Sequence, residues 1–352
     1  MAKIVFAVGG TGGHLFPAQA LAKDLYEEGH EILFAGGKLG MNPFFKKEQF
    51  PFQEIKGASP FRANPLKACL QLILGTFASV KLLKDFSPDY VIGFGSFYSF
   101  PILAAAFLKK IPYILVESNA HPGKVNRLFS KRAQFSALQY KEAAPHLKGK
   151  THLTKIPLLT NSCPLDPSEA KKYYGLDSSL FTLLIFGGSQ GASSLNRAAE
   201  QLSTQVQVLH FCGKGGKVEE LKAQYKSKGV RASVKPFEER MDIAFQAADL
   251  ALCRSGGGTV SELIEFTTPS ILVPWPGATE NHQHKNAQVL ENRGGAIILE
   301  QQAIDSLPQA IEKAKDKLEQ MRACLQKEKA KLPQPLKNLI MDQLLTCKNT
   351  TI

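Results

Sequence analysis

Two glycine-rich segments, each placed directly after an apolar run, constrain the fold of this chain more than any other feature. The first, Gly9-Gly10-Thr11-Gly12-Gly13, follows the apolar residues 4–8 and precedes a segment with helical spacing of apolar residues. The second spans residues 187–191 and has the same surroundings, about half a chain further on. A strand, a glycine turn and a helix that recur in this way predict two similar doubly wound halves rather than one barrel.

The rest of the sequence alternates strand-like and helix-like segments. We expect strands at residues 31–36, 90–95, 112–117, 206–213, 248–253 and 270–275. We expect helices at residues 17–28, 65–85, 99–109, 218–228, 241–247, 260–266 and 282–293. This order implies parallel sheets with right-handed crossovers, and so an α/β protein with two Rossmann-like domains.

The length of 352 residues also favours two domains. Residues 155–167 are rich in proline and lack periodicity, which is typical of a linker. We therefore expect an N-terminal domain at 1–157 and a C-terminal domain at 158–332, the latter ending in a charged amphipathic helix over 303–331. Residues 333–352 are expected to form a helix that packs back on the first domain.

Charge and cysteine content limit the partners and the compartment. The net charge of +12 favours an anionic partner such as nucleic acid, a phosphorylated ligand or an acidic membrane, although solubility alone also explains it. No recognisable motif supports nucleic acid. The six cysteines are scattered without CxxC spacing, so we expect neither a zinc site nor a disulfide framework. They are typical of a protein in the reducing cytosol.

Residues 66–83 form the longest apolar stretch. Its uncharged part, between Lys67 and Lys81, is shorter than the roughly 20 residues of a membrane span. Two alternatives remain, a buried helix or an interfacial helix flanked by Arg62, Lys67, Lys81 and Lys84.

The glycine turns indicate the chemistry of the ligand. A helix N-terminus presents unpaired N–H groups and partial positive charge, and glycine lets the backbone approach an anion closely. Such turns suit a phosphate or an oxygen-rich sugar, and in open parallel sheets they lie where ligands bind. A lone glycine cluster is often only a tight turn, but a third cluster at residues 256–258 weakens that explanation.

The third cluster also carries an acid. Glu262 is expected in the first turn of the following helix. A carboxylate there accepts hydrogen bonds from two ribose hydroxyls while the N–H groups face phosphate. A helix-capping glutamate is the alternative.

Taken in order, the motifs resemble the MurG family. They are GGTGGH at residues 9–14, GFGSFYSFP at 93–101, ESNAHPGKVNR at 117–127, GGSQGA at 187–192, RSGGGTVSE at 254–262 and NHQ at 281–283. The resemblance implies a GT-B fold with two Rossmann-like domains facing a central cleft. It implies N-acetylglucosamine (GlcNAc) transfer from UDP-GlcNAc to the lipid-linked MurNAc-pentapeptide acceptor, at the cytoplasmic face of the inner membrane and without a cofactor.

The resemblance places the donor in the C-terminal half. Glu262 would bind the ribose, and Phe237 would stack on or border the uracil. His282 and Gln283 would contact the GlcNAc hydroxyls, although the residue types alone fit ordinary polar helix-start positions equally well. The residues that would face the pyrophosphate are Ser189, Gln190, Ser255, Gly256 and Thr259.

The acceptor would occupy the N-terminal half. The residues implied there are Thr11, Gly12, Gly13, His14 and Asn119, with Asn126 on the same segment as Asn119. Transfer needs a base for the acceptor hydroxyl, and His14 is the candidate because an unperturbed histidine titrates near neutral pH. The alternative, that His14 only binds the acceptor pyrophosphate or caps the turn, stays open.

Four positions depart from the family pattern. Leu159 stands where an arginine would approach the donor phosphates, and Lys155 is a possible substitute. Glu238 replaces an apolar residue, Val116 a histidine, and Ser96 the second of two glycines.

An Asp-x-Asp triplet does not occur in the sequence, so we expect no metal clamp; helix dipoles and N–H groups would stabilise the leaving group. Two other functions remain possible: a different UDP-sugar glycolipid glycosyltransferase and a nucleotide-sugar-binding protein without turnover.

Overall fold

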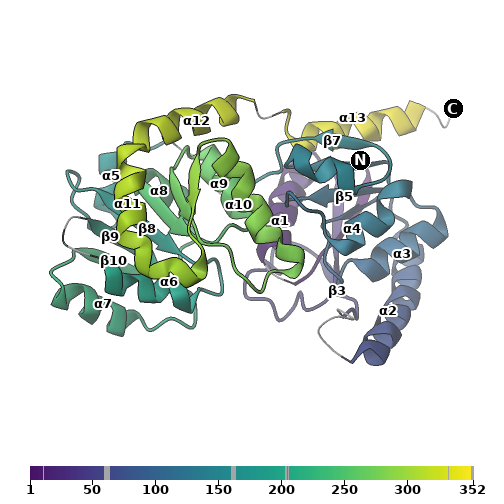
Figure 1. Ribbon diagram of the computed structural model, residues 1–352. Helices are drawn as coiled ribbons and strands as arrows, with labels where there is room; N and C mark the ends of the chain where they lie inside the picture. Colours follow the sequence, from purple (N-terminus) through teal and green to yellow (C-terminus); the bar gives the residue numbers. More distant parts are fainter. Residues whose placement is uncertain are drawn as a thin grey trace. The chain divides into compact units, whose positions relative to one another are not determined.

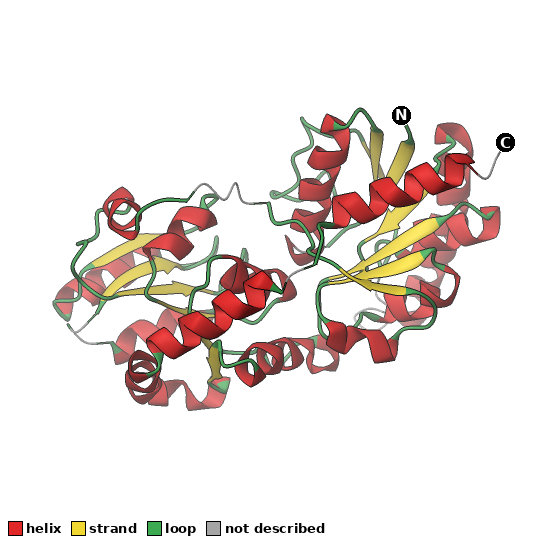
Figure 2. Ribbon diagram, turned by 90° about the horizontal axis from the view of Figure 1, so that it is seen from above, coloured by secondary structure: helices red, strands yellow, loops and turns green. Residues whose placement is uncertain are grey.

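The computed structural model describes residues 1–10, 12–58, 64–159, 164–202, 204, 206–331 and 333–349, with no account of the side chains of residues 199 and 345–349. The chain forms two compact units (Figures 1 and 2). One comprises Met1–Leu159 and Pro333–Ile352, and the other Thr160–Leu332. The first division falls after Leu159, two residues beyond the expected boundary. Ile156 is buried in the N-terminal core and Lys155 bridges to Pro335, so the start of the expected linker belongs to the N-terminal unit.

The N-terminal unit is a parallel sheet with the order β3-β2-β1-β4-β5-β6-β7. Its strands are β1 (Lys3–Ala7), β2 (Glu31–Gly36), β3 (Phe52–Glu54), β4 (Tyr90–Gly93), β5 (Tyr113–Glu117), β6 (Phe135–Leu138) and β7 (Thr151–Leu153). Its helices are α1 (Gly12–Glu27), α2 (Pro65–Phe86), α3 (Phe100–Lys109), α4 (Lys124–Phe129) and α13 (Leu336–Asn349), with short 3₁₀ turns η1 (Ser130–Arg132) and η2 (Lys141–His146). The strand order reverses between β1 and β4, which is where ligands bind in such sheets.

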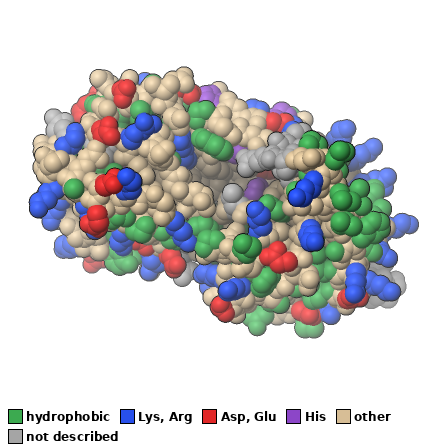
Figure 3. All heavy atoms as spheres, turned by 90° about the horizontal axis from the view of Figure 1, so that it is seen from below, with side chains coloured by type: hydrophobic (Ala, Val, Ile, Leu, Met, Phe, Trp, Pro, Cys, Tyr) green, Lys and Arg blue, Asp and Glu red, His purple; other side chains and the backbone are tan. Residues whose placement is uncertain are grey.

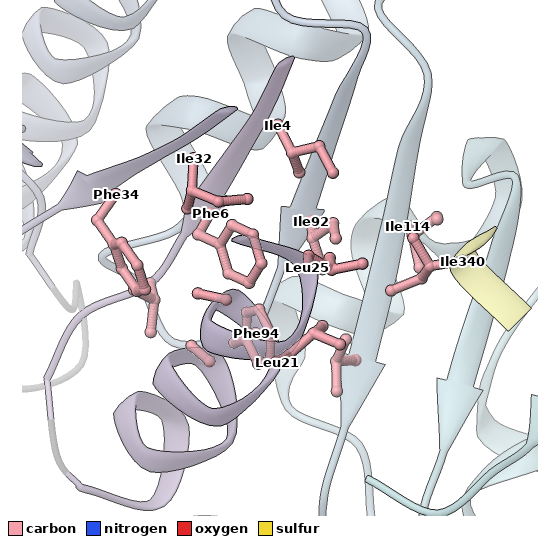
Figure 4. Close-up of a cluster of buried hydrophobic side chains, with 14 of the residues drawn as sticks. Ile4, Phe6, Leu21, Leu25, Ile32, Phe34, Ile92, Phe94, Ile114 and Ile340 are labelled. Atoms are coloured by element: carbon pink, nitrogen blue, oxygen red, sulfur yellow. The ribbon is translucent and has the colours of Figure 1, made fainter. Parts of the chain in front are cut away.

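One core of this unit lies between the sheet, α1 and α13. Phe6, Phe34 and Ile92 point from the strands toward Leu21 of α1, and Ile340 of α13 lies beside Ile114 (Figure 4). The terminal helix therefore closes the core of the N-terminal unit, although it follows the C-terminal unit in the sequence. Lys337 on the same helix pairs with Glu28.

The C-terminal unit is a second parallel sheet, with the order β10-β9-β8-β11-β12-β13. Its strands are β8 (Thr182–Phe186), β9 (Gln207–Phe211), β10 (Ala232–Lys235), β11 (Leu250–Cys253), β12 (Ser270–Leu272) and β13 (Ala296–Ile298). Its helices are α5 (Pro167–Tyr173), α6 (Ser193–Arg197), α7 (Val218–Ser227), α8 (Met241–Ala247), α9 (Gly257–Glu265), α10 (His282–Asn292), α11 (Leu307–Asp316) and α12 (Leu318–Ala330). The 3₁₀ turns are η3 (Ala198–Gln201), η4 (Thr279–Asn281) and η5 (Gln301–Ser306). The strand order reverses between β8 and β11.

Two helices begin earlier than the sequence predicted. α1 begins at Gly12 rather than at Pro17, and α9 begins at Gly257 rather than at Val260. Glycine has a low helix propensity, so these positions resembled turns, but packing of the helices on the sheet overrides that preference. Gly12 and Gly13 therefore lie in the first turn of α1, and Gly257 and Gly258 lie in the first turn of α9.

The predicted helix over 303–331 is also different. It consists of η5, α11 and α12, with a break at Lys317, where φ is −112° and ψ is 7°. The two helices bury separate residues, Leu307 and Ile311 on α11 and Met321 and Leu325 on α12.

Within the described ranges, α2 is the one helix that is long and apolar enough to cross a membrane, by length and composition only. Its buried residues form a narrow stripe: Ala68, Leu72, Gly75, Ser79 and Leu83. Only 28% of its apolar window is buried, although Val80, Leu82 and Phe86 near its C-terminal end pack against the core.

Candidate functional site

The first glycine turn joins β1 to α1 at the reversal of strand order in the N-terminal unit. Gly10 has a φ of +91°, which favours glycine, and Asn42 Nδ2 donates to its carbonyl oxygen at 2.8 Å. Gly13 is exposed, and a Cβ atom there would meet nothing within 4 Å. Protein packing therefore does not require this glycine in the helix, whereas close approach of a ligand would. Thr11 lies outside the described residues.

His14 is the third residue of α1 and is partly buried. Its Nδ1 lies 2.7 Å from the carbonyl oxygen of Phe94, which directly follows β4. A carbonyl oxygen only accepts, so Nδ1 carries the hydrogen and the neutral ring has its lone pair on Nε2. This arrangement suits a general base and also suits a ligand for a phosphate or hydroxyl.

A buried carboxylate organises the segment that contains Asn119. Glu117 ends β5 and is 3% exposed. Its Oε1 accepts from the backbone N–H and the side-chain amide of Asn119, both at 3.0 Å. Its Oε2 accepts from the backbone N–H of Gly123 and from Asn126 Nδ2, both at 2.9 Å. This role of Glu117 was not predicted from the sequence, although an acid at the end of an apolar strand was the available signal.

Asn126 brings this segment next to His14. A Cβ atom on Gly95 would lie 3.4 Å from Asn126 Nδ2 and 3.6 Å from His14 Cε1. Asn126 Nδ2 donates to two acceptors, Glu117 Oε2 and the Val116 carbonyl, which fixes the orientation of the amide. Its buried Oδ1 has no hydrogen-bond partner among the described residues. A ligand hydroxyl or N–H group would satisfy this oxygen.

The departure at Ser96 leaves the backbone geometry in place. Gly95 and Ser96 have φ values of +78° and +73°, so serine adopts the left-handed conformation that glycine prefers. The Ser96 side chain accepts a hydrogen bond from the backbone N–H of Tyr98 at 3.3 Å.

The second glycine turn follows β8, at the reversal of strand order in the C-terminal unit. The N–H of Gly191 donates to the carbonyl of Gly188 at 2.9 Å, which closes a tight turn. Gly188 has a φ of +80° and is exposed, and Ser189 and Gln190 lie at the tip of this turn. The turn is therefore open to a ligand beyond the carboxyl end of β8.

The third turn follows β11, the strand beside β8. Gly256 is the N-cap residue of α9 and has no side chain to cap the N–H groups of the first turn. A Cβ atom on Gly258 would meet nothing within 4 Å, although glycine costs helix stability. The glycines keep this helix N-terminus accessible to an anion. Thr259 is partly exposed on the same turn.

Glu262 is the sixth residue of α9, so the expectation that it lies in the first turn was wrong. The helix begins three residues earlier than predicted, which moves the carboxyl into the second turn. The side chain is partly buried, and loss of hydration raises the pKa of Glu262 to about 8. Burial, with the nearby Glu262, also raises the pKa of the Cys253 thiol.

Gln283 links the third turn to the start of α10. Its backbone carbonyl accepts from Ser255 Oγ at 2.8 Å, and its side-chain oxygen accepts from the backbone N–H of Trp275 at 2.9 Å. His282 Nδ1 lies 2.9 Å from the carbonyl oxygen of Thr279. Glu280 and Asn281, just before α10, are two consecutive non-glycine residues with φ near +50°, at 52° and 55°. Such strain is typical of functional segments.

Phe237 follows β10 and is partly buried, two strands away from β8. The side chain of Glu238, next to it, is turned inward: it is 8% exposed and pairs with Lys235 at 2.9 Å. Burial alone would raise the pKa of Glu238, but the hydrogen bond and charge of Lys235 lower it below the usual value. The positive charge of Lys235 therefore compensates the negative charge of Glu238 within the C-terminal unit.

Among the described residues, no three His, Cys, Asp or Glu side chains form a group that could hold a metal ion. The metal-independent reaction that the sequence suggested stays a prediction. Leu159 and Lys155 both belong to the N-terminal unit.

Comparison with known proteins defines the class. Residues 4–137 match the glycosyltransferase family 28 N-terminal domain, and residues 182–342 match the glycosyltransferase family 28 C-terminal domain. The crystal structure of Acinetobacter baumannii MurG is 27% identical with a TM-score of 0.78, covering 98% of this chain and 100% of that chain. The two parallel-sheet units with glycine turns at their switch points thus make this a GT-B glycosyltransferase of family 28.

Curated relatives narrow the assignment. The UDP-N-acetylglucosamine–N-acetylmuramyl-(pentapeptide) pyrophosphoryl-undecaprenol N-acetylglucosamine transferase of Protochlamydia amoebophila is 40% identical over 315 residues, 86% of this chain and 84% of that protein. The same enzyme of Halothermothrix orenii is 36% identical over 318 residues, 84% of this chain and 85% of that protein. The chain belongs to the MurG family, as its motifs predicted.

Proposed function

We propose that this chain is an inverting glycosyltransferase that moves GlcNAc from UDP-GlcNAc to the C4 hydroxyl of MurNAc in undecaprenyl-pyrophosphoryl-MurNAc-pentapeptide (lipid I). The product is lipid II, the complete lipid-linked precursor of peptidoglycan. The observation that carries the proposal is the pair of accessible glycine turns at the switch point of the C-terminal sheet, beyond β8 and β11. The transferase names of the relatives at 36–40% identity support the same donor and acceptor.

The donor occupies the C-terminal unit in this proposal. The N-terminus of α9 and the turn at residues 187–191 bind the pyrophosphate through N–H groups, and Ser189, Gln190 and Thr259 add polar contacts. Glu262 accepts from the ribose hydroxyls. Gln283 and His282 contact the sugar, and the Ser255–Gln283 hydrogen bond keeps the sugar and phosphate subsites in register.

The acceptor occupies the N-terminal unit. The C4 hydroxyl attacks C1 of GlcNAc, the bond from C1 to the UDP oxygen breaks, and the hydroxyl proton passes to Nε2 of His14. UDP leaves with the negative charge, which the helix N-terminus and the glycine N–H groups stabilise. A single displacement inverts the anomeric carbon from α to β. Asn119 and Asn126, held by Glu117, orient the acceptor.

Product analysis tests this function. Purified protein is incubated with radiolabelled UDP-GlcNAc and a short-chain version of the lipid acceptor, and the expected product is a disaccharide-linked lipid. Transfer to another lipid, with none to the MurNAc acceptor, would favour a different glycolipid glycosyltransferase. UDP-GlcNAc binding without transfer to any acceptor would favour a nucleotide-sugar-binding protein.

We further propose that α2 and the end of α3 form a membrane-docking surface. Its apolar residues are Leu66, Leu70, Ile73, Leu74 and Phe77 on α2 with Phe107 and Leu108 on α3, and all are exposed. Leu66 is 82% and Phe77 71% exposed, which argues against the alternative that these side chains belong to the core. Phe61 and Arg62 lie outside the described residues.

Basic residues border this surface. Lys67, Lys81, Lys84, Lys109 and Lys110 are all exposed. Figure 3 shows hydrophobic side chains gathered beside Lys and Arg side chains on the N-terminal unit. An apolar face with a basic border is typical of peripheral binding to an anionic bilayer. The protein would then work at the cytoplasmic face of the inner membrane, where the lipid-linked acceptor lies.

A further inference from the structure

Arg254 connects the two glycine turns of the C-terminal unit through neutral acceptors. Its Nη1 donates to the carbonyl oxygens of Val273 and Pro274 at 2.9 and 3.2 Å. Its Nη2 donates to Ser194 Oγ at 2.9 Å and to Gln301 Oε1 at 2.6 Å. In the part of the chain that the structure describes, no carboxylate pairs with this guanidinium.

The position of Arg254 relates it to both turns. It directly precedes Ser255, where the turn before α9 begins. Its partner Ser194 is the second residue of α6, which directly follows the turn at residues 187–192. The same guanidinium also fixes the chain after β12 through the carbonyls of Val273 and Pro274. One side chain thereby ties the start of the turn before α9 to the start of α6, the helix that follows the other glycine turn.

The charge of this side chain is uncompensated. Burial lowers the pKa of Arg254, but an arginine remains protonated in proteins. A buried or half-buried charge is normally paired, because leaving it unpaired costs free energy. Neutral acceptors satisfy its N–H groups without cancelling its positive potential, so the charge acts on an anion bound nearby.

The loss of the family arginine at position 159 suggests a role for the charge of Arg254. The family resemblance implies an arginine there for the donor phosphates, and this chain has an apolar residue. We propose that Arg254 is a positioning residue that holds the two turns together and supplies the positive charge that favours the donor pyrophosphate. This inference rests on the proposed donor site.

Nucleotide binding by charge-removing and charge-keeping variants tests the inference. Arg254→Gln keeps polarity without charge, and Arg254→Lys keeps charge without the planar fork. Arg231→Gln is the matched control, since Arg231 is exposed, pairs with Asp177 and precedes β10, an edge strand three positions from β11 in the same sheet. Calorimetry measures the affinities of UDP and uridine for each variant, and thermal unfolding checks that each is folded.

The expected result is selective for phosphate. Arg254→Gln should lower the affinity for UDP by about tenfold and that for uridine by less than about twofold, because only UDP carries charge. Arg254→Lys should keep the UDP-to-uridine affinity ratio within about threefold of wild type. Arg231→Gln should match wild type for both ligands.

Other outcomes overturn the inference. An Arg254→Gln protein with wild-type affinities for both UDP and uridine would show that the charge does not act on the phosphates, and an equal loss of affinity for both ligands would show a purely structural role. Should Arg254→Gln fail to fold, Arg254→Lys decides, and a tenfold fall in its ratio would contradict the proposal. Failure of the wild-type protein to bind UDP would instead reject the proposed donor site.

Discussion

His14 Nδ1 lies 2.7 Å from the carbonyl oxygen of Phe94, so the ring is held across the switch point between β1 and β4. The acceptor on Nδ1 places the basic lone pair of the neutral ring on Nε2. A histidine fixed in this tautomer resembles the general bases of many enzymes, in which a hydrogen bond to one nitrogen orients the other.

We predict that His14→Ala depresses kcat by about 10²- to 10⁴-fold, the usual contribution of a general base. Substrate affinity should change little, and the acidic limb of the pH profile of kcat should disappear. Steady-state kinetics between pH 5.5 and 9 measures both. A rise in the KM of the acceptor with the acidic limb retained would show that His14 binds the acceptor and does not accept the proton.

Glu262 is predicted to bind the ribose from the second turn of α9. Loss of its hydrogen bonds should cut kcat/KM by about tenfold to thousandfold in Glu262→Ala, a loss of about 1.4–4 kcal/mol. The effect should appear mainly in the donor KM. Unchanged kinetics in a folded variant would reject the ribose assignment.

The raised pKa of Glu262 predicts a pH dependence of stability. Its pKa rises from 4.5 in the unfolded chain to about 8 in the folded protein, so folding favours the protonated form. This contribution is fully present below pH 4.5 and is lost as the pH rises toward 8. We predict that the Tm of ligand-free wild type falls between pH 6.5 and 8.5 relative to that of Glu262→Gln, which has no proton to lose.

The pH window for that comparison avoids a second buried group. Burial lowers the pKa of His210 to about 4, so its effect on stability appears as the pH falls from about 6.5 to 4. Parallel Tm curves for wild type and Glu262→Gln above pH 6.5 would mean that Glu262 ionises normally in the folded protein.

Hydrophobic periodicity predicted the long elements because their patterns span several turns or a complete strand. The predicted ranges 241–247 and 31–36 coincide with α8 and β2. Strands such as β7 and β13 have three residues each, too few to establish a pattern. The starts of α1 and α9 were predicted too late, because glycine has a low helix propensity and tertiary packing holds the first turns of these helices.

Only the parts of the candidate site that lie in short, local sequence motifs could be predicted. The glycine turns, His14 and Glu262 lie in short motifs with a recognisable chemistry. The hydrogen-bond partners of the site residues lie far away in the sequence, so no local motif predicts them. The bond from His14 to Phe94 spans 80 residues, and that from Arg254 to Ser194 spans 60. Glu117 is the first residue of the motif ESNAHPGKVNR, but its four hydrogen bonds depend on how the loop after β5 folds back.

Metal dependence is a separate prediction. We expect activity to survive EDTA, because glycine turns and a helix N-terminus bind phosphates through N–H groups. The measurement is the transfer rate with short-chain acceptor before and after chelation. Complete loss of activity that only Mg²⁺ or Mn²⁺ restores would contradict the prediction, while a similar rate with and without EDTA would support it.

The docking surface gives the last prediction, and its matched control lies in the other unit. Lys226, Lys317 and Lys327 are exposed on the C-terminal unit. Their reversal to glutamate changes the net charge by the same amount as reversal at Lys67, Lys81 and Lys84. A difference between the two triple variants therefore reports on location and not on total charge.

We predict that wild type and the control variant cosediment with vesicles containing anionic lipid, and that high salt releases both. Each basic residue near the bilayer adds about 1 kcal/mol, so charge reversal at Lys67, Lys81 and Lys84 should release the protein. That variant should retain activity on a detergent-soluble, short-chain acceptor, because these lysines lie on α2 and not at the switch points. If it cosediments as well as wild type, α2 is not the docking surface. If both variants are released equally, the attraction depends on net charge alone.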